Sequence, residues 1–432
     1  MAVNNIIKRI QNIMRQDAGI NGDAQRIEQM TWMFFLKVYD TQEETWEWKD
    51  EKYKSIIPED LRWRNWAIDK KDGEALTGEA LLSFVKDLQS AGNAGEFYTP
   101  RALTDFIVMM LDPKLGETFG DFTSGTGGFL TSALKYMGRN IGSAADGEKL
   151  QNAVVGQEWK PLPYLLSITN LLLHDIEAPN ITNCDSLGTN VTDFKESDKV
   201  DVIGMNPPYG GSTEDSVKSN FPVQYRSSET ADLFIALIMY RLKAGGRCGV
   251  IIPDGFLFGT DGAKLALKEN LLRKFNLHTI IRLPGSIFSP YTSIATNILF
   301  FNNEEAEGCE EGFKTKETWF YRLDMPEGYK HFSKTKPMKV EHTLPIQEWW
   351  KDRKEIISDE VGEKSRVFTA QQLIDLDCNF DQCKFPKEEE EILPPAELLK
   401  QYFEKRAALD HEIDKTLSEI QKILGIDIKS CN

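Results

Sequence analysis

Residues 206–209 carry groups that could hold a planar amine. They read Asn-Pro-Pro-Tyr and follow the apolar stretch KVDVIGM (199–205). Pro207 and Pro208 cannot continue a strand ladder, so the strand must end there in a rigid turn. The Asn206 side-chain carbonyl and the Pro207 main-chain carbonyl can each accept an amino hydrogen, and Tyr209 offers a flat face for stacking. By itself, this motif is more simply interpreted as a rigid turn without a ligand.

A glycine-rich turn, DFTSGTGGFL (121–130), lies between a predicted strand and a predicted helix. Gly125, Gly127 and Gly128 would let the backbone turn tightly and approach a ligand closely. The motif departs from the dinucleotide fingerprint because position 130 is leucine, and no lysine follows the glycines as a phosphate-binding P-loop needs. A purely structural turn is the alternative.

Two carboxylates end the next two predicted strands. Glu158 could accept both hydroxyls of a ribose, and Asp185 could accept from an exocyclic amine such as that of adenine. Taken singly, each could instead be a helix cap or a solvated loop acid. Together with the glycine turn they suit a nucleoside without a pyrophosphate, and S-adenosylmethionine, a cation, is such a ligand.

These sites combine into one reaction, the transfer of a methyl group to an amino nitrogen. Two acceptors aimed at the amino hydrogens would draw the nitrogen toward a tetrahedral shape and point its lone pair at the methyl group. Alignment and electrostatics would supply most of the rate, so no general base of lowered pKa is needed. An amine inside a duplex cannot be reached, so the target nucleotide must be flipped out.

Alternating strands and helices predict an α/β sheet with mostly parallel strands and helices on both faces. Ligands of such sheets bind at the carboxyl ends of the strands, where all the motifs above fall. The predicted helices include 103–111, 127–137, 161–176, 231–243 and 266–275. The predicted strands are 117–122, 153–158, 180–184, 199–205, 247–253, 278–284 and 293–301.

The sequence divides into four predicted regions: a helical domain over 1–90, the α/β domain over 91–325, an irregular polar region over 326–391 and a last helix within 392–432. The first holds five of the nine tryptophans, which form either a core or a docking surface for a partner: Trp32, Trp46, Trp48, Trp63 and Trp66. The last helix has an apolar stripe that could pack on its own domain or pair with a helix of another chain. The stripe consists of Leu399, Tyr402, Leu409, Ile413, Leu417, Ile420 and Leu424.

Composition limits the class of protein. The six cysteines form no CxxC pair and the five histidines show no metal-ligand spacing, so we expect free thiols and no metal. No apolar run approaches the roughly 18–20 residues of a membrane helix and no signal peptide is present, so we expect a cytoplasmic protein without a membrane partner. The net charge of −16 is awkward for a protein that touches DNA, because phosphate contacts supply much of the affinity.

Five motifs in order give the chain a family resemblance: GEFYTPR (95–101), DFTSGTGGFL, GQEW, NCDSL and NPPYGG. The chain resembles, over nearly its whole length, the modification (M) subunit of type I restriction–modification systems, which are adenine-specific DNA methyltransferases of the N-6 adenine family. The resemblance implies a Rossmann-like, seven-stranded S-adenosylmethionine-dependent methyltransferase domain with a helical N-terminal domain and a C-terminal helical tail. Nuclease and helicase signatures are lacking, so DNA cleavage would belong to another subunit.

The resemblance also implies roles for residues. Asn206, Pro207, Pro208 and Tyr209 would hold the target base, while Glu158 would bind the ribose and Asp185 the adenine of the cofactor. Phe288, in GSIFSPYTS, would be either a second stacking wall or a core residue. Other cofactor residues would close over the methionine end (Glu96, Phe97, Tyr98, Thr99, Pro100, Arg101) or line the glycine turn (Asp121, Ser124, Gly125, Thr126, Gly127).

One position departs from the family pattern. Family members commonly read DPACGTGGF where this chain reads DFTSGTGGF, so Phe122 replaces a proline. Because the glycines are retained, we expect cofactor binding to be retained, with altered affinity.

The partners implied are DNA, a specificity (S) subunit that reads a bipartite sequence and binds two M subunits, and a restriction (R) subunit in the full complex. The terminal helix would pack on the helical spacers of the S subunit. An acidic M subunit is then compatible with a complex in which the S subunit supplies most of the affinity for DNA. Two alternatives remain: a protein-glutamine methyltransferase that uses the same NPPY clamp, and a catalytically silent cofactor-binding scaffold.

Overall fold

The structure is a computed structural model that describes residues 22–49, 53–55, 57, 59, 62–67, 99–211, 213–289, 292, 294–333, 336–359, 362–386 and, with gaps, 397–416. Two compact units divide the chain, Met1–Phe385 and Pro386–Asn432. Within the first unit, the N-terminal region contains helix α2 (Gly22–Lys49) and the short helix α3 (Trp63–Trp66). Trp46 packs against Tyr39 and Tyr53 as a core residue would, whereas Trp48 is 86% exposed.

A single mixed sheet forms the centre of the first unit, with strand order β3-β2-β1-β4-β5-β7-β6-β8-β10-β9. Strands β3, β2, β1, β4 and β5 are parallel, and β7 is antiparallel to both β5 and β6. All seven predicted strands are present, which confirms the seven-stranded methyltransferase fold. They are β1 (Phe119–Asp121), β2 (Val154–Glu158), β3 (Ile181–Asn183), β4 (Val200–Met205), β5 (Leu242–Pro253), β6 (Asn276–Arg282) and β7 (Thr296–Asn302).

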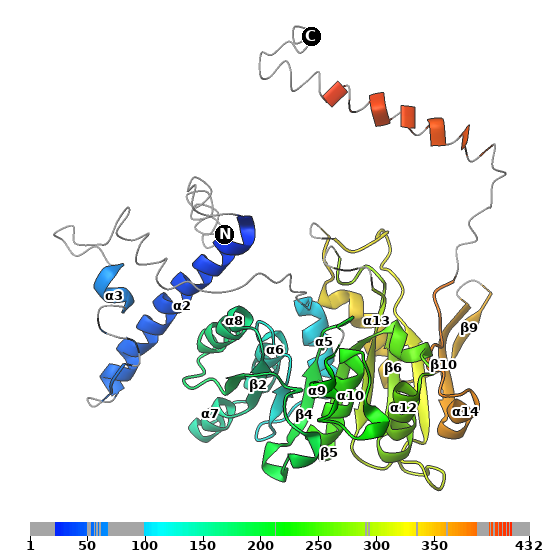
Figure 1. Ribbon diagram of the computed structural model, residues 1–432, viewed down its shortest axis with the longest axis horizontal. Coiled ribbons are helices and arrows are strands. Elements are labelled where there is room, and N and C mark those ends of the chain that lie inside the picture. Colours follow the sequence, from blue (N-terminus) through cyan, green and yellow to red (C-terminus); the bar gives the residue numbers. More distant parts are fainter. Residues whose placement is uncertain are drawn as a thin grey trace. The chain divides into compact units, whose positions relative to one another are not determined.

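Helices cover both faces of this sheet (Figure 1). Successive strand residues point to opposite faces, so Ile203 joins one core while its neighbour Val202 joins the other. One face is covered by α10 (Thr230–Arg241), α12 (Gly262–Lys274) and α14 (Ala370–Asp375), and the other by α5 (Arg101–Leu111), α6 (Gly128–Gly138), α8 (Pro161–Leu172) and α13 (Leu344–Lys351). Shorter helices are α7 (Ala144–Gln151), α9 (Asp215–Lys218) and α11 (Asp254–Phe258).

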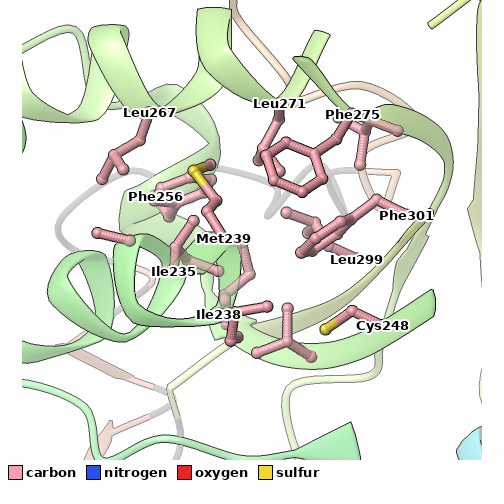
Figure 2. Packing of buried hydrophobic residues seen from close by; sticks show 14 of the residues in the cluster. Ile235, Ile238, Met239, Cys248, Phe256, Leu267, Leu271, Phe275, Leu299 and Phe301 are labelled. Atoms are coloured by element: carbon pink, nitrogen blue, oxygen red, sulfur yellow. The ribbon is translucent and has the colours of Figure 1, made fainter. Parts of the chain in front are cut away.

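The core beneath α10 and α12 consists of side chains from both helices and from strands β5 and β7 (Figure 2). Its members carry no charge and are almost entirely excluded from water, so their burial stabilises the sheet by about 25 cal/mol per Å² of apolar surface. The labelled side chains are Ile235, Ile238, Met239, Cys248, Phe256, Leu267, Leu271, Phe275, Leu299 and Phe301.

Three further strands extend the sheet beyond the predicted seven: β8 (Glu317–Arg322), β10 (Gly362–Thr369) and β9 (Ile356–Ser358). Strand β8 is parallel to β6, and β10 is antiparallel to both β8 and β9. This differs from the irregular polar region expected over 326–391, where α13, β9, β10 and α14 lie. The two strands escaped prediction because β9 has only three residues, none of them buried, and β10 (GEKSRVFT) is partly exposed and contains three charged residues, which hides its alternation.

In the second unit, the described residues between 397 and 416 are helical, in agreement with the predicted last helix. The stripe residues Leu399, Tyr402, Leu409 and Ile413 are each more than half exposed. Its remaining predicted members, from Leu417 on, lie outside the described residues. Among the helices that the structure describes, none combines the length and apolar character needed to cross a membrane.

Candidate active site

The predicted site residues of β1, β2, β3 and β4 meet at the carboxyl edge of the sheet, because these four strands are parallel neighbours. Asp121 ends β1, Glu158 ends β2, and Asn206 directly follows β4. The Thr123 hydroxyl donates to the Asn206 main-chain carbonyl at 3.3 Å. The glycine-rich turn and the NPPY turn are therefore in direct contact.

The glycine-rich turn depends on a left-handed backbone at Gly125 (φ 53°) and Gly127 (φ 76°). A Cβ atom at Gly127 would lie 2.7 Å from the Ser167 Oγ atom of α8, so glycine is required there for space as well as for conformation. The turn is closed by the Gly127 N–H, which donates to the Ser124 carbonyl at 2.7 Å. Asn170 of α8 donates from its side chain to the Thr126 carbonyl at 2.9 Å and fixes the far side.

Buried polar atoms surround this turn without partners among the described residues: Ser124 Oγ, Ser167 Oγ and Gln157 Oε1. Buried polar atoms in proteins are nearly always hydrogen-bonded, so these three atoms are available to a polar molecule. Ser124 is in the turn, Gln157 is in β2, and Ser167 faces Gly127. The turn thus combines a backbone that a ligand can approach closely with side-chain donors and acceptors that have no hydrogen-bond partner.

Glu158 is held against the turn by the backbone. Its Oε2 atom accepts from the Gly125 N–H at 2.8 Å, and its Oε1 atom accepts from the Lys160 N–H at 2.9 Å. Each carboxylate oxygen has a second lone pair, so both can still accept a hydroxyl.

Asp121 is 1% exposed, and burial, together with the nearby charge of Glu158, raises its pKa to about 8. Its Oδ1 atom accepts from the Thr123 N–H at 3.1 Å. Asp121 therefore supports the turn from below.

Asp185 lies two residues after β3 and is half-buried. Its Oδ1 atom accepts from the Leu187 N–H at 3.0 Å, which closes a local turn, as the loop-acid alternative anticipates. The next residue, Ser186, is buried and donates to the Phe122 carbonyl at 2.6 Å, so this loop is tied to the start of the glycine-rich turn. Asp185 is thereby placed at the same edge as Glu158, one strand further out.

The Asn206 side chain is held on both sides. Its Nδ2 atom donates to the Thr99 hydroxyl at 2.9 Å, and its Oδ1 atom accepts from the Tyr209 hydroxyl. Burial raises the pKa of the Tyr209 phenol well above its ordinary value, so the phenol keeps its proton and remains a donor. One of the two predicted acceptors is thus engaged within the motif itself, a contact that the sequence analysis did not anticipate.

Thr99, which is predicted to close over the methionine end of the cofactor, accepts a hydrogen bond from the Asn206 side chain through its hydroxyl. Arg101 donates to the Gly128 carbonyl at 2.8 Å and to the Thr131 hydroxyl, so it anchors the start of α5 on α6. Glu96, Phe97 and Tyr98 lie outside the described residues. The described residues of the GEFYTPR motif therefore hold other parts of the site in place: Thr99 holds Asn206, and Arg101 holds the start of α6.

Phe288 is 2% exposed and its ring is edge-on to that of Tyr209, with centroids 6.4 Å apart. This burial favours the core alternative for Phe288. Pro207 is buried and Pro208 exposed, so the rigid turn is anchored at one proline only.

Phe122, which stands where relatives commonly have proline, is 1% exposed and lies under the Arg241 guanidinium, 3.9 Å from its carbon to the ring centroid. Burial lowers the pKa of Arg241 to about 10. The phenylalanine therefore fills a core position and stabilises a buried cation.

Comparison with known proteins agrees with this geometry. Residues 76–392 match the N-6 DNA Methylase family, and residues 3–110 match the HsdM N-terminal domain. The type I restriction enzyme EcoEI methylase subunit of Escherichia coli is 38% identical over 98% of both chains.

Solved structures give the same result. A modification subunit of a putative type I restriction enzyme from Vibrio vulnificus YJ016 is 33% identical, with a TM-score of 0.70 over 86% of this chain and 92% of that one. A chain from a study of complex assembly and conformational transition in a type I R-M system is 30% identical, with a TM-score of 0.73 over 98% of both chains.

The fold and the site define an amino-group methyltransferase of the α/β class. The chain belongs to the N-6 DNA methylase family, among the methylase (M) subunits of type I restriction–modification systems.

Proposed function

We propose that this chain transfers a methyl group from S-adenosylmethionine to the exocyclic amino nitrogen of a flipped-out adenine in DNA, while a separate S subunit supplies sequence specificity. One observation carries the proposal: the Asn206 amide is held by Thr99 at the end of β4, in contact with the glycine-rich turn. An amine acceptor and the polar turn proposed for the cofactor then lie side by side.

The residues around the turn fit the cofactor. Its unpaired polar atoms, Ser124 Oγ, Gln157 Oε1 and Ser167 Oγ, offer partners to the amino-acid portion, and the open space at Gly125 lets that portion approach closely. The spare lone pairs of Glu158 suit ribose hydroxyls, and those of Asp185 suit the adenine amine. When bound, S-adenosylmethionine would supply the methyl group that is transferred.

The NPPY turn would hold the target amine. The Asn206 Oδ1 atom accepts one amino hydrogen once the Tyr209 hydroxyl has moved away, and the Pro207 carbonyl accepts the other. Tyr209 stacks on the base after that movement. Thr99 accepts from the Asn206 Nδ2 atom, and this contact holds the amide with its oxygen directed away from Thr99 and toward the base.

Partners follow from the family. We infer that the chain acts on DNA in a complex of two M subunits and one S subunit. An R subunit would join this complex for DNA cleavage. The relatives named above are methylase subunits of multisubunit enzymes, which supports this assembly. The terminal helix, with its exposed apolar stripe, is the proposed contact with the S subunit.

The test is Asn206→Ala in the complex with the S subunit. We expect adenine methylation to fall by about 10²- to 10³-fold, the usual cost of removing one donor or acceptor aimed at the reacting group, with cofactor affinity unchanged. Transfer of radiolabelled methyl groups to duplex DNA and calorimetric binding of S-adenosylmethionine measure the two effects. Asn140→Ala, at an exposed position just beyond α6, is the matched control and should behave as wild type.

Unchanged methylation in Asn206→Ala would overturn the clamp assignment. Label appearing on protein instead of DNA would favour the glutamine methyltransferase alternative.

A further inference from the structure

A basic segment lies within this acidic chain. Residues 328–339, GYKHFSKTKPMK, contain four lysines (Lys330, Lys334, Lys336 and Lys339) and no acidic residue, in a chain with a net charge of −16. Neither the fold nor the proposed chemistry accounts for this concentration of positive charge.

The segment lies at the carboxyl edge of the sheet, beside the NPPY turn. The Phe332 N–H donates to the Ser286 hydroxyl at 3.0 Å. Ser286 precedes Phe288 by two residues, and the Phe288 ring contacts the Tyr209 ring. A short chain of contacts therefore links the lysine segment to the proposed target-base clamp.

An aromatic cluster anchors the segment. Phe332 is 2% exposed and stacks on His342 with ring centroids 5.6 Å apart, and Tyr329 packs against both rings. The Ser333 N–H donates to the Lys336 carbonyl at 3.1 Å, which closes a tight turn. These contacts fix the backbone at Phe332, Ser333 and Lys336, and the Lys336 Nζ atom lies 5.7 Å from the centroid of the Tyr329 ring.

Three of the four lysines of this segment lie among the described residues. Lys330, Lys336 and Lys339 are described and exposed, and within the described part of the chain none of them forms an ion pair with a carboxylate. The nearby Asp324 is already paired with Arg322 and Lys364. The charges of the three lysines are therefore available to an external anion.

We propose that Lys330, Lys336 and Lys339 form a DNA-backbone contact and bind phosphates that flank the flipped-out adenine. The inference rests on the proposed function and adds the surface through which this subunit itself holds DNA. Lysine is suited to phosphate as a compact charge on a flexible stem, and such contacts fix register without reading sequence. Positive charge in this segment, next to the proposed target-base clamp, would also offset the electrostatic repulsion between the acidic subunit and DNA.

The experiment uses the chain co-expressed with its S subunit and the triple variant Lys330→Gln, Lys336→Gln, Lys339→Gln. Binding of a labelled duplex that contains the recognition site is measured between 50 and 200 mM salt. We expect the slope of log affinity against log salt to become shallower by up to about 3, because each phosphate contact contributes about 0.9. The KM for DNA should rise, while kcat and the affinity for S-adenosylmethionine stay unchanged.

The matched control is Lys135→Gln, Lys195→Gln, Lys274→Gln, which changes the net charge by the same amount. These lysines are exposed in the last turn of α6, just before β4 and at the end of α12, toward the amino edge of the parallel strands. We expect a slope close to that of wild type. An equal loss of slope in the two triple variants would overturn the proposal, because it would show only a general charge effect.

Other results are also decisive. Failure of the 328–339 variant to co-purify with the S subunit, with unchanged DNA binding by any complex formed, would assign the segment to an acidic protein surface and overturn the proposal. If the wild-type complex methylates no adenine, the proposed function fails, whereas the binding slopes still test the lysines separately.

Discussion

At the scale of single residues, the site depends on how one amide is oriented. Asparagine has a donor end and an acceptor end of nearly equal shape, so its environment must decide which end faces the target. Thr99 accepts from the Asn206 nitrogen, and Tyr209 donates to the Asn206 oxygen. The two contacts agree on the same orientation, with the oxygen on the side of the base-stacking ring.

Thr99→Val removes the acceptor for the Asn206 nitrogen while conserving side-chain shape. We expect kcat to fall about tenfold, the equivalent of one hydrogen bond, with cofactor affinity unchanged. Thr99→Ser, which keeps the hydroxyl, should retain most of the wild-type rate. Steady-state kinetics and calorimetry of cofactor binding check this.

A loss of S-adenosylmethionine affinity in Thr99→Val, with kcat preserved, would instead place Thr99 on the cofactor, as the family resemblance implies.

Residue types at the site could be predicted from sequence, but their partners could not. The motifs located Glu158, Asp185 and Asn206 because strand ends are visible in the apolar pattern. The contact between Thr99 and Asn206 joins positions 107 residues apart, so only the folded chain determines it. The hydrogen bond from the Tyr209 hydroxyl to Asn206 was not predicted, because the sequence suggested only a stacking role for the tyrosine ring.

At the scale of elements, the glycine-rich turn couples backbone conformation to helix packing. Gly127 is left-handed and faces Ser167 of α8 across a gap too small for a side chain. The turn and α8 therefore fix each other's position, and the unpaired polar atoms lie along their boundary.

Gly127→Ala should destabilise the fold for two reasons. A non-glycine residue in the left-handed region costs about 1–2 kcal/mol, and the contact with Ser167 Oγ adds to this. The double variant Gly127→Ala, Ser167→Ala should recover only the free energy lost to the contact with Ser167 Oγ, and not the cost of the left-handed backbone. Denaturant unfolding measures both.

Gly147→Ala, in α7 where an added methyl group meets nothing within 4 Å, is the control and should be neutral or stabilising. Equal stability of Gly127→Ala and wild type would contradict this account of the turn.

Element by element, the sequence predicted the seven central strands and the five helices between them. Apolar strands buried on both faces have clear ends, and helical spacing is distinct from them. Strands β9 and β10 lack that signal because both are partly exposed to solvent. ETWFYR (317–322) had a recoverable signal, since its aromatic and β-branched residues favour a strand.

At the scale of the whole molecule, the chain separates into a sheet unit and a terminal unit that begins at Pro386. The described residues of the terminal unit expose their apolar side chains, which is expected for a helix that completes its packing on another chain.

A chain that ends at Phe385 tests this division. We expect the thermal unfolding midpoint of the sheet unit to stay within about 2 °C of wild type, because its core side chains all precede that residue. Co-purification with the S subunit should be lost. A midpoint lowered by 10 °C or more, about the effect of several kcal/mol, would show that the tail belongs to the sheet unit's core.

The order of the ten strands has a consequence for solubility. The sheet ends in β3 on one side and β9 on the other, and both strands are only three residues long. An unpaired strand edge is a template for joining further chains, and a short edge offers few backbone groups for that purpose. The extension through β8 and β10 thus lets a strongly apolar central sheet end in short edge strands that disfavour self-association. Resistance to aggregation suits a subunit that assembles with other chains.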